Sequence, residues 1–507
     1  MTETSGQFNR RNFIASAAAG VGLAGAGGVS LKAHAATAYD LIVIGAGTAG
    51  IPCAISAAEK GAKVLVIEKA ISIGGTLWVS GGSMAAAGTR MQARNGIKDS
   101  ADTHYADIMR LSKNKADPAV VRRYVDGAGP MADWLESLGY QTRDGDPVMG
   151  RGGHAAFSAA RYFTAAERGR SLLAVLVPAL QKHVTSGNVR MVMGTGAVEL
   201  VIGSDRSVQG VIAVGDDGVR TQFSARKVAI TSGGYCYSPE MFQRVTGYKQ
   251  HIAAGFYMSK GEGLLLGEGA GGFVRGGEYQ VLGPGGIVND RNYPSPATYV
   301  PELDHQRRPQ WEIRVNIQGK RFVREDEPDM DLRDTLFTEQ PTQRMWIVFD
   351  QEIWDEAPPI IENKQKSVVT PLFGNHPMFF KGQSIKDLAK NAAIDVNGLQ
   401  RTVQDYNAGV RNKRDSLGRQ FLPSEIAKPP FYAFEVSGGN IIGFGGLAVN
   451  GDMQLLRRDG SVIKNLYAAG EVIGLAHVAG NAAVQGSGVT PSVTFGRQVG
   501  LDVMSNA

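Results

Sequence analysis

Three glycines and one acid near the start of the chain have a spacing that suits the binding of phosphates and a ribose. Gly45, Gly47 and Gly50 form a G-x-G-x-x-G pattern, and Glu68 follows Gly45 by 23 residues. In such a pattern the first glycine permits a tight turn, the second lets backbone approach a pyrophosphate, and the third lets a helix pack closely on a strand. An acid about 20 residues further on accepts hydrogen bonds from a ribose diol. These four residues therefore predict a dinucleotide site.

The flanking sequence supplies the elements that such a site needs. Leu41–Ile44 is an apolar run typical of a buried parallel strand, a helical pattern continues to about Lys60, and Lys63–Ile67 predicts the next strand. The helix N-terminus offers unpaired N–H groups and the positive end of a dipole to phosphates. An ordinary glycine-rich turn is the alternative, but strand, glycines, helix, strand and acid in this order favour a nucleotide. The pattern does not choose between FAD and NAD.

Composition and charge set broader limits. The chain has 507 residues, 43% of them apolar, which is enough for two domains with their own cores. Its 66 glycines exceed the usual share, as expected of an α/β protein with many βα turns. A formal charge of +5 without a basic stripe and interleaved aromatics gives no indication of a nucleic-acid partner. Cys53 and Cys236 form neither a C-x-x-C-H haem motif nor a metal-ligand spacing, and two buried thiols are expected rather than a disulfide.

The first 35 residues have the features of an export signal. Asn9–Ile14 reads N-R-R-N-F-I, a twin-arginine pattern, and a glycine- and alanine-rich segment follows it. Ala33-His34-Ala35 provides an A-x-A cleavage site. We therefore expect residues 1–35 to be a cleaved signal that engages the twin-arginine translocase, and the protein to be periplasmic; an uncleaved anchor is the alternative. Twin-arginine export carries folded proteins, which suits a chain that must load a cofactor before export.

A second glycine-rich loop indicates which dinucleotide is bound. Gly74–Gly75 and Ser80–Gly82 form the pattern GG-x-x-x-x-SGG after the second strand. This loop is unlike NAD dehydrogenases and resembles FAD enzymes of the fumarate reductase and succinate dehydrogenase flavoprotein superfamily, in which it wraps the flavin. The resemblance implies non-covalent FAD, because the loop lacks the histidine to which the respiratory members attach theirs. A flexible surface loop is the alternative.

The resemblance covers nearly all of the chain after residue 35 and implies its fold. Asn465–Val472 resembles the family's L-Y-A-A-G-E strand and turn, and Ile317–Glu325 resembles its G-K-R-F-V-N-E segment. The implied fold is α/β: a Rossmann-like FAD-binding domain formed by residues 36–255 and 431–507, with an inserted α+β capping domain for the substrate at residues 256–430.

The resemblance also implies which residues hold the cofactor. Glu471 is expected to bond the second ribose or the ribityl hydroxyls, and a helix that starts near Gly488–Pro491 to aim its N–H groups at the pyrimidine edge of the flavin. Backbone near Val198 is expected to meet the adenine, and no metal site is expected. The complete expected FAD site is Gly45, Gly47, Thr48, Ala49, Gly50, Glu68, Lys69, Gly75, Thr76, Ser80, Gly81, Gly82, Val198, Gly233, Glu471, Gly488 and Val489.

Two departures from the fumarate reductases bear on the substrate. Those enzymes fix a dicarboxylate with a histidine before M-G-G and an arginine in H-G-A-N-R-L-G-G-N-A. Here Asn440–Gly446 has no histidine, and His477–Ala483 keeps a histidine but has no arginine. Two carboxylates need several cationic or strongly donating partners before they leave water. We therefore expect an apolar pocket and disfavour fumarate or succinate as the substrate.

An apolar pocket with tyrosines resembles the 3-ketosteroid dehydrogenase branch of the superfamily. In that branch a tyrosine removes a proton next to a ketone, the flavin takes a hydride from the neighbouring carbon, and donors polarise the ketone oxygen. Tyr235 and Tyr237 follow the turn at the end of Lys227–Gly234, so either is the expected base, with His477 as a second polar group. The implied reaction is α,β-desaturation of a small apolar or steroid-like ketone. Plain packing of the tyrosines and backbone bonding of His477 are the alternatives.

Two other functions remain open. An enone or enoate reductase would run the reaction in reverse with electrons from a periplasmic cytochrome, and Arg333 in Leu332-Arg333-Asp334 resembles the family's proton-delivering arginine. The spacing of Arg333 from G-K-R-F is longer than in the family, so a salt-bridged residue is the alternative. A flavoprotein that only relays electrons is the third function, against which the long insertion argues. In each case electrons pass to or from an external carrier, a quinone or a cytochrome, because the chain carries no haem motif.

Overall fold

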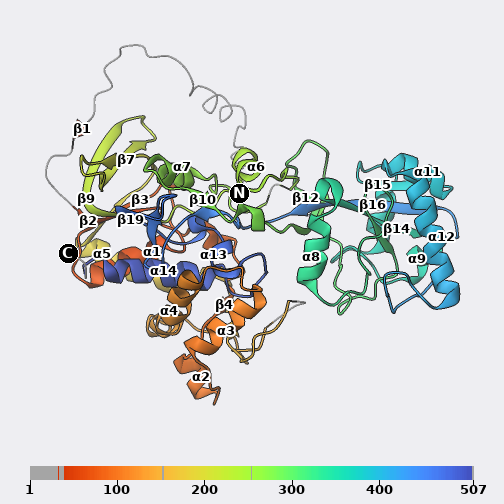
Figure 1. Ribbon diagram of the computed structural model, residues 1–507, viewed down its shortest axis with the longest axis horizontal. Helices are drawn as coiled ribbons and strands as arrows, with labels where there is room; N and C mark the ends of the chain where they lie inside the picture. The colour runs from red at the N-terminus through yellow and green to blue at the C-terminus, as the bar shows by residue number, and fades with distance from the viewer. Residues whose placement is uncertain (1–31, 34–38, 151–153, 253, 505–507) are drawn as a thin grey trace, which may run out of the picture.

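The computed structural model describes residues 32–33, 39–150, 154–252 and 254–504, which form two units side by side (Figure 1). The larger unit is built on a parallel sheet with the strand order β19-β9-β2-β3-β6. The bounds of these strands are β2 Tyr39–Ile44, β3 Val64–Ile67, β6 Val189–Val192, β9 Arg220–Ile230 and β19 Val462–Ala468. The expected export signal lies outside the described residues except for β1 (Lys32–Ala33), which pairs with β9.

The centre of this sheet is apolar because its strands are buried on both faces. Leu41, Ile42 and Val43 of β2 are each 0% exposed, and all four residues of β3 are buried. Such continuous apolar strands are typical of parallel sheets covered by helices. The strand order places β2 in the middle, so the turn after β2 opens at the carboxyl edge of the sheet, where α/β proteins bind their ligands.

Two helices that are far apart in the sequence pack together beneath the sheet. They are α1 (Gly50–Glu59) and α14 (Val489–Asp502). A Cβ on Gly496 would lie 2.1 Å from the Ala49 carbonyl oxygen, and a Cβ on Gly500 would lie 2.3 Å from the Cys53 carbonyl oxygen. The backbones therefore touch, and only glycine fits at these two positions of α14.

The remaining elements of the larger unit extend its sheet or cover it. β7 and β8 form an antiparallel hairpin that continues the sheet at β9, and β18 pairs with β19. The other elements are β7 Thr195–Ile202, β8 Val208–Gly215, β18 Gln454–Leu456, β10 Val274–Arg275, β17 Gly446–Leu447, β4 Met84–Ala85, β5 Tyr162–Phe163, α2 Arg90–Arg94, α3 Ala101–Leu111, α4 Pro118–Ser137, α5 Gly169–Thr185, α6 Pro239–Thr246, α7 Glu262–Gly269 and α13 Ala476–Ala479.

The smaller unit has its own antiparallel sheet with helices around it (Figure 1). The sheet order is β12-β11-β16-β14-β13, and β15 also pairs with β16. Its elements are β11 Gly283–Val288, β12 Ala297–Tyr299, β13 Ile313–Val315, β14 Arg344–Asp350, β15 Phe379–Gly382, β16 Phe431–Gly439, α8 Met330–Thr338, α9 Gln351–Glu356, α10 Lys366–Val369, α11 Ile385–Ala392 and α12 Val396–Asn412. This sheet spans residues 283–439, so it begins and ends later than the segment 256–430 expected for the capping domain.

A buried network of charges ties the loops of the smaller unit together. Glu325 is 0% exposed and pairs with Arg321 at 2.6 Å and with Arg419 at 3.0 Å. Burial alone would raise the pKa of Glu325, but the two guanidinium groups and a backbone N–H of Arg314 outweigh it and hold the pKa at about 2. The carboxylate therefore stays ionised at neutral pH, and the network keeps its partners in place.

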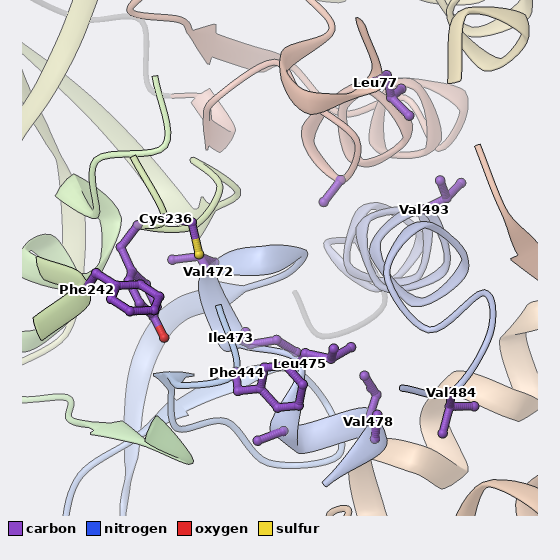
Figure 2. Packing of buried hydrophobic residues seen from close by; sticks show 14 of the residues in the cluster. Leu77, Cys236, Phe242, Phe444, Val472, Ile473, Leu475, Val478, Val484 and Val493 are labelled. Carbon is purple, nitrogen blue, oxygen red and sulfur yellow. The ribbon is translucent and has the colours of Figure 1, made fainter. Parts of the chain in front are cut away.

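The core of the larger unit continues into the segment that returns after β16. Figure 2 shows Phe444, Val472, Ile473 and Leu475 packed in it, with Cys236 beside Val472. Cys53 and Cys236 are both buried free thiols. Within the part of the chain that the structure describes, a helix long and apolar enough to span a membrane is not found.

Candidate active site

A cavity of about 670 Å³ opens at the carboxyl edge of the parallel sheet. The turn after β2, the end of β3, the hairpin strand β7, the first residues of α7 and the start of α14 all contribute to its wall. Of the residues expected to bind FAD, all but Gly50 and Gly82 line this cavity: Gly45, Gly47, Thr48, Ala49, Glu68, Lys69, Gly75, Thr76, Ser80, Gly81, Val198, Gly233, Glu471, Gly488 and Val489. The sequence motifs thus come together around one space.

The three glycines of the first turn have three different environments. Gly45 adopts a φ of +101°, which glycine alone adopts readily. A Cβ on Gly47 would meet only Gly75 Cα at 3.9 Å, so the backbone there faces open space. A Cβ on Gly50 would lie 1.8 Å from the Gly45 carbonyl oxygen, which explains why Gly50 supports the turn without lining the cavity. This is the geometry that a phosphate-binding turn requires.

Glu68 is held in position by two backbone N–H groups. Ala46 N–H donates to Oε2 at 2.7 Å, and Ala70 N–H donates to Oε1 at 2.8 Å. A carboxylate has about four lone-pair directions, so each oxygen keeps the capacity to accept a further bond from a hydroxyl. The arrangement fits a ribose at the end of β3.

The GG-x-x-x-x-SGG loop is folded onto the first turn. Gly74 N–H donates to the Ala46 carbonyl at 2.8 Å, and the Thr48 and Thr76 hydroxyls lie 3.3 Å apart. Gly82 has a φ of +67°, and a Cβ there would lie 2.4 Å from backbone of Arg168, so this residue shapes the loop from outside the cavity. The two glycine-rich segments therefore form one wall.

Glu471 provides a second carboxyl group in the cavity wall. It accepts a hydrogen bond from Gly443 N–H at 3.3 Å, and a Cβ on Gly234 would lie 2.3 Å from Glu471 Oε1. Burial raises the pKa of Glu471 from 4.5 to about 7, an effect that the N–H groups of Gly443 and Gly234 only partly offset. Glu471 can therefore donate or accept a hydrogen bond near neutral pH.

Two helix N-termini adjoin the cavity. α1 begins directly after the first turn, and α14 begins at Val489, which lines the cavity with Gly488 and Ser492. Unpaired N–H groups and a positive dipole end at both helices favour negative charge. One suits a pyrophosphate, and the other suits the electron-rich pyrimidine edge of a flavin.

Several cavity residues were not found from the sequence. Phe256, Met258, Ile441 and Ile442 give part of the wall an apolar surface, and Glu262 also lines the cavity. Residues 256–262 are separated from the KVAITSGG strand by α6, so no motif next to them in the sequence placed them near the cofactor. Ile441 and Ile442 lie in Asn440–Gly446, the segment from which an apolar pocket was expected, and both line the cavity.

The structure places both candidate tyrosines outside the wall formed by the described residues that line the cavity. Tyr235 is 0% exposed, and its hydroxyl oxygen accepts a hydrogen bond from Gly445 N–H at 3.2 Å. Burial raises the pKa of Tyr235 far above its usual value, so the phenol is not available as a base in this structure. Tyr237 is 41% exposed, and its backbone N–H bonds the Ser259 carbonyl.

His477 is buried in a polar junction rather than at the cavity. Its Nε2 accepts from Arg275 Nε at 2.7 Å, and Arg275 in turn donates to Asp117 at 2.6 Å. Burial and the neighbouring guanidinium lower the pKa of His477 to about 3. The imidazole is therefore neutral, and its contacts join β10, α4 and α13.

Arg333 belongs to α8, and this helix lies on the side of the smaller unit that faces the larger one (Figure 1). It is 6% exposed and donates through Nη1 to the Leu303 carbonyl at 2.7 Å, while its Nε finds no hydrogen-bond partner among the described residues. Two residues earlier on the same helix, Asp331 accepts from His154 at 3.1 Å and from Ala483 N–H at 3.4 Å. These two contacts join α8 to the larger unit.

Comparison with known proteins supports FAD as the cofactor of this site. A family model described as an FAD binding domain matches residues 40–489. A probable fumarate reductase, Ifc3, from Shewanella frigidimarina is 27% identical over 471 residues, which cover 92% of this chain and 75% of the relative. A vinyl phenol reductase from Lactiplantibacillus plantarum is 28% identical over 457 residues, covering 85% of this chain and 89% of the relative.

A solved structure shares the fold. The 3-ketosteroid delta1-dehydrogenase from Sterolibacterium denitrificans superposes with a TM-score of 0.69 at 18% identity, over 93% of this chain and 100% of that chain. The expected α/β fold and FAD as the cofactor are thereby confirmed.

Proposed function

Since the chain belongs to the FAD binding domain family, we propose that it reduces the activated C=C bond of a small, largely apolar substrate. The chain is an FAD-dependent oxidoreductase of the class that acts on C=C and CH–CH bonds. What remains to be proposed is the kind of substrate and the direction of the reaction.

The character of the cavity wall carries the proposal for the substrate. Phe256, Met258, Ile441 and Ile442 form its apolar part, and among the described residues that line the cavity Lys69 is the one cation. A dicarboxylate would need several cationic partners to leave water, whereas an apolar or aromatic substrate gains free energy by burying its surface against such a wall. An apolar alkene conjugated to an aromatic ring or a carbonyl fits best.

The burial of Tyr235 and the names of two relatives support reduction as the direction of the reaction. Desaturation needs a base beside the reacting carbon, and Tyr235, one of the expected bases, is held in the core. Two relatives at 27% and 28% identity are named as reductases. This reverses the preference drawn from the sequence, in which desaturation of a ketone came first.

The proton for reduction must come from a group of this chain. FAD, when bound, supplies the hydride. Arg333 is the proposed proton donor, because its Nε–H is buried without a partner among the described residues and its helix is joined to the larger unit through Asp331. Glu471, Glu68 and the two helix N-termini hold the cofactor and take no part in this proton transfer.

Electron supply and location complete the proposal. The chain lacks a C-x-x-C-H motif, so we propose an external carrier, a cytochrome or a quinone. Residues 1–35 are proposed to direct export through the twin-arginine translocase. Replacement of Arg10 and Arg11 by lysine is then expected to retain the protein in the cytoplasm, as cell fractionation would report.

The substrate and direction can be tested with one anaerobic experiment. The purified yellow protein is reduced chemically and mixed with fumarate, a cinnamate-type acid, a vinyl phenol and a cyclic enone, and the return of the oxidised flavin absorbance is followed. The proposal expects fast reoxidation by the aromatic and enone substrates and slow reoxidation by fumarate. Bleaching of the oxidised protein by saturated ketones, with no reoxidation by alkenes, would instead establish desaturation.

A further inference from the structure

One side chain crosses from the central sheet to α7 at the edge of the cavity. Lys69 follows β3, and a Cβ on Gly196 of β7 would lie 3.7 Å from both Lys69 Cγ and Cδ. The stem of Lys69 therefore lies over β7. Its Nζ reaches Glu262 Oε1, at the first residue of α7, with a distance of 2.6 Å. Three elements of the cavity wall are thus connected by one ion pair.

The ion pair lies at one particular end of the cavity. Lys69, Gly196, Ala197, Val198 and Glu262 all line it, and they flank the position of Glu68. Since Glu68 marks the ribose next to the adenine, this is the end that receives the adenosine half of FAD. Neither residue of the ion pair belongs to the apolar set Phe256, Met258, Ile441 and Ile442 that is proposed to face the substrate.

The exposure of the pair argues that it contributes little to the folding of the protein. The Lys69 and Glu262 side chains are 54% and 40% exposed. Exposed ion pairs stabilise a fold only weakly, and salt screens them. An interaction of this strength is too weak to define the fold, but it is strong enough to change a rate of opening severalfold.

We propose that Lys69 and Glu262 form a strap over the adenosine end of the cavity and that this strap slows the release of FAD. To leave, the adenosine half must pass between β7 and α7, and this requires the ion pair to break. Both residues act by closing the cavity and by positioning one another. Neither takes part in the reaction, and the proposal depends only on FAD binding, not on the substrate.

A double-mutant cycle tests the strap. The variants are Glu262→Gln, Lys69→Met and the two combined, each loaded with FAD. FAD release is followed by the rise of free flavin fluorescence after dilution at low ionic strength. Either single variant is expected to release FAD about two- to fivefold faster, and the double variant no faster than the singles, because each change breaks the same ion pair. Added salt should accelerate release from the unaltered protein towards the rate of the variants.

A matched control is available on the same helix. Arg244–Glu268 is also an exposed ion pair, and neither residue is among those that line the cavity. Glu268→Gln should leave the FAD release rate and its salt dependence unchanged. If the two substitutions accelerate FAD release independently, so that their effects combine in the double variant, the side chains bind FAD separately and the strap is overturned. A release rate that none of the substitutions changes would overturn it as well. Urea midpoints of the four apoproteins, which should agree closely, exclude a general loss of folding.

Discussion

The raised pKa of Glu471 predicts a specific pH dependence of the apoprotein. In the folded state the pKa rises from 4.5 to about 7. Each pKa unit is worth about 1.4 kcal/mol, so ionised Glu471 destabilises the folded apoprotein by about 3 kcal/mol. The carboxyl group is neutral below pH 4.5, where this cost is absent. The cost grows as the pH rises from 4.5 to 7 and stays constant above 7.

The measurement compares the unaltered apoprotein with Glu471→Gln, which keeps the shape of the side chain but cannot ionise. Urea unfolding of both is followed at a series of pH values, and the difference in free energy of unfolding is plotted, so that contributions of other titrating groups cancel. The variant should gain up to about 3 kcal/mol over the unaltered protein as the pH passes from 4.5 to 7. A difference that does not change across this interval would refute the reasoning, because it would mean that the carboxyl is not desolvated.

The same group links FAD binding to pH. If sugar hydroxyls donate to the Glu471 carboxylate, FAD binds the ionised form better and releases a proton as it binds. The affinity should then rise by up to about tenfold per pH unit between 4.5 and 7. Calorimetry in two buffers of different ionisation enthalpy counts the protons directly. Glu471→Gln should release none, and an unchanged proton count in this variant would assign the effect to another group.

Three further substitutions have clear expected outcomes. Gly50→Ala should give protein that loses FAD on desalting, since the new Cβ would lie 1.8 Å from a backbone oxygen of Gly45, whereas Gly269→Ala, which meets nothing within 4 Å, should stay yellow. Glu325→Gln should cost about 3–5 kcal/mol in urea unfolding, because it removes the negative charge that the buried Arg321 and Arg419 share. The contribution of Glu325 itself is present above pH 4.5 and is lost as the pH falls towards 2. Tyr235→Phe should cost about 1 kcal/mol of stability for one lost hydrogen bond and leave turnover unchanged, so a large loss of turnover would restore its role as the base.

The cofactor site was predictable because the residues that shape it lie close together in the sequence. Gly45, Gly50 and Glu68 lie within one strand–turn–helix–strand unit, and their roles follow from backbone geometry over a few residues. The apolar runs on either side leave little choice of structure, since each is long enough to be a strand and too short to be a helix. The prediction of FAD rather than NAD needed the second loop, which packs directly onto the first through Gly74 and Ala46.

The burial of Tyr235 and His477 was not predictable in the same way, because burial is decided by contacts far along the chain. Tyr235 follows a turn that leads to the cavity, yet its hydroxyl bonds Gly445, and its ring lies where a Cβ on Gly443 would be 2.5 Å from it. His477 is similarly held by Arg275, 202 residues away. The same reasoning applies to β16, which the sequence placed in the FAD-binding domain. It pairs with β14, so it lies in the sheet of the smaller unit.

The backbone contact between α1 and α14 has a consequence for the placement of the cofactor. Gly496 and Gly500 allow these helices to lie so close that neither can slide along the other without collision. The distance between their N-termini is therefore fixed, and it sets how far apart the two groups that they contact can lie. A flavin mononucleotide carries both a flavin and a phosphate and could engage both termini, so this fixed distance sets where the flavin lies relative to the phosphates, and selection of the full dinucleotide falls to the adenosine end of the cavity at Glu68.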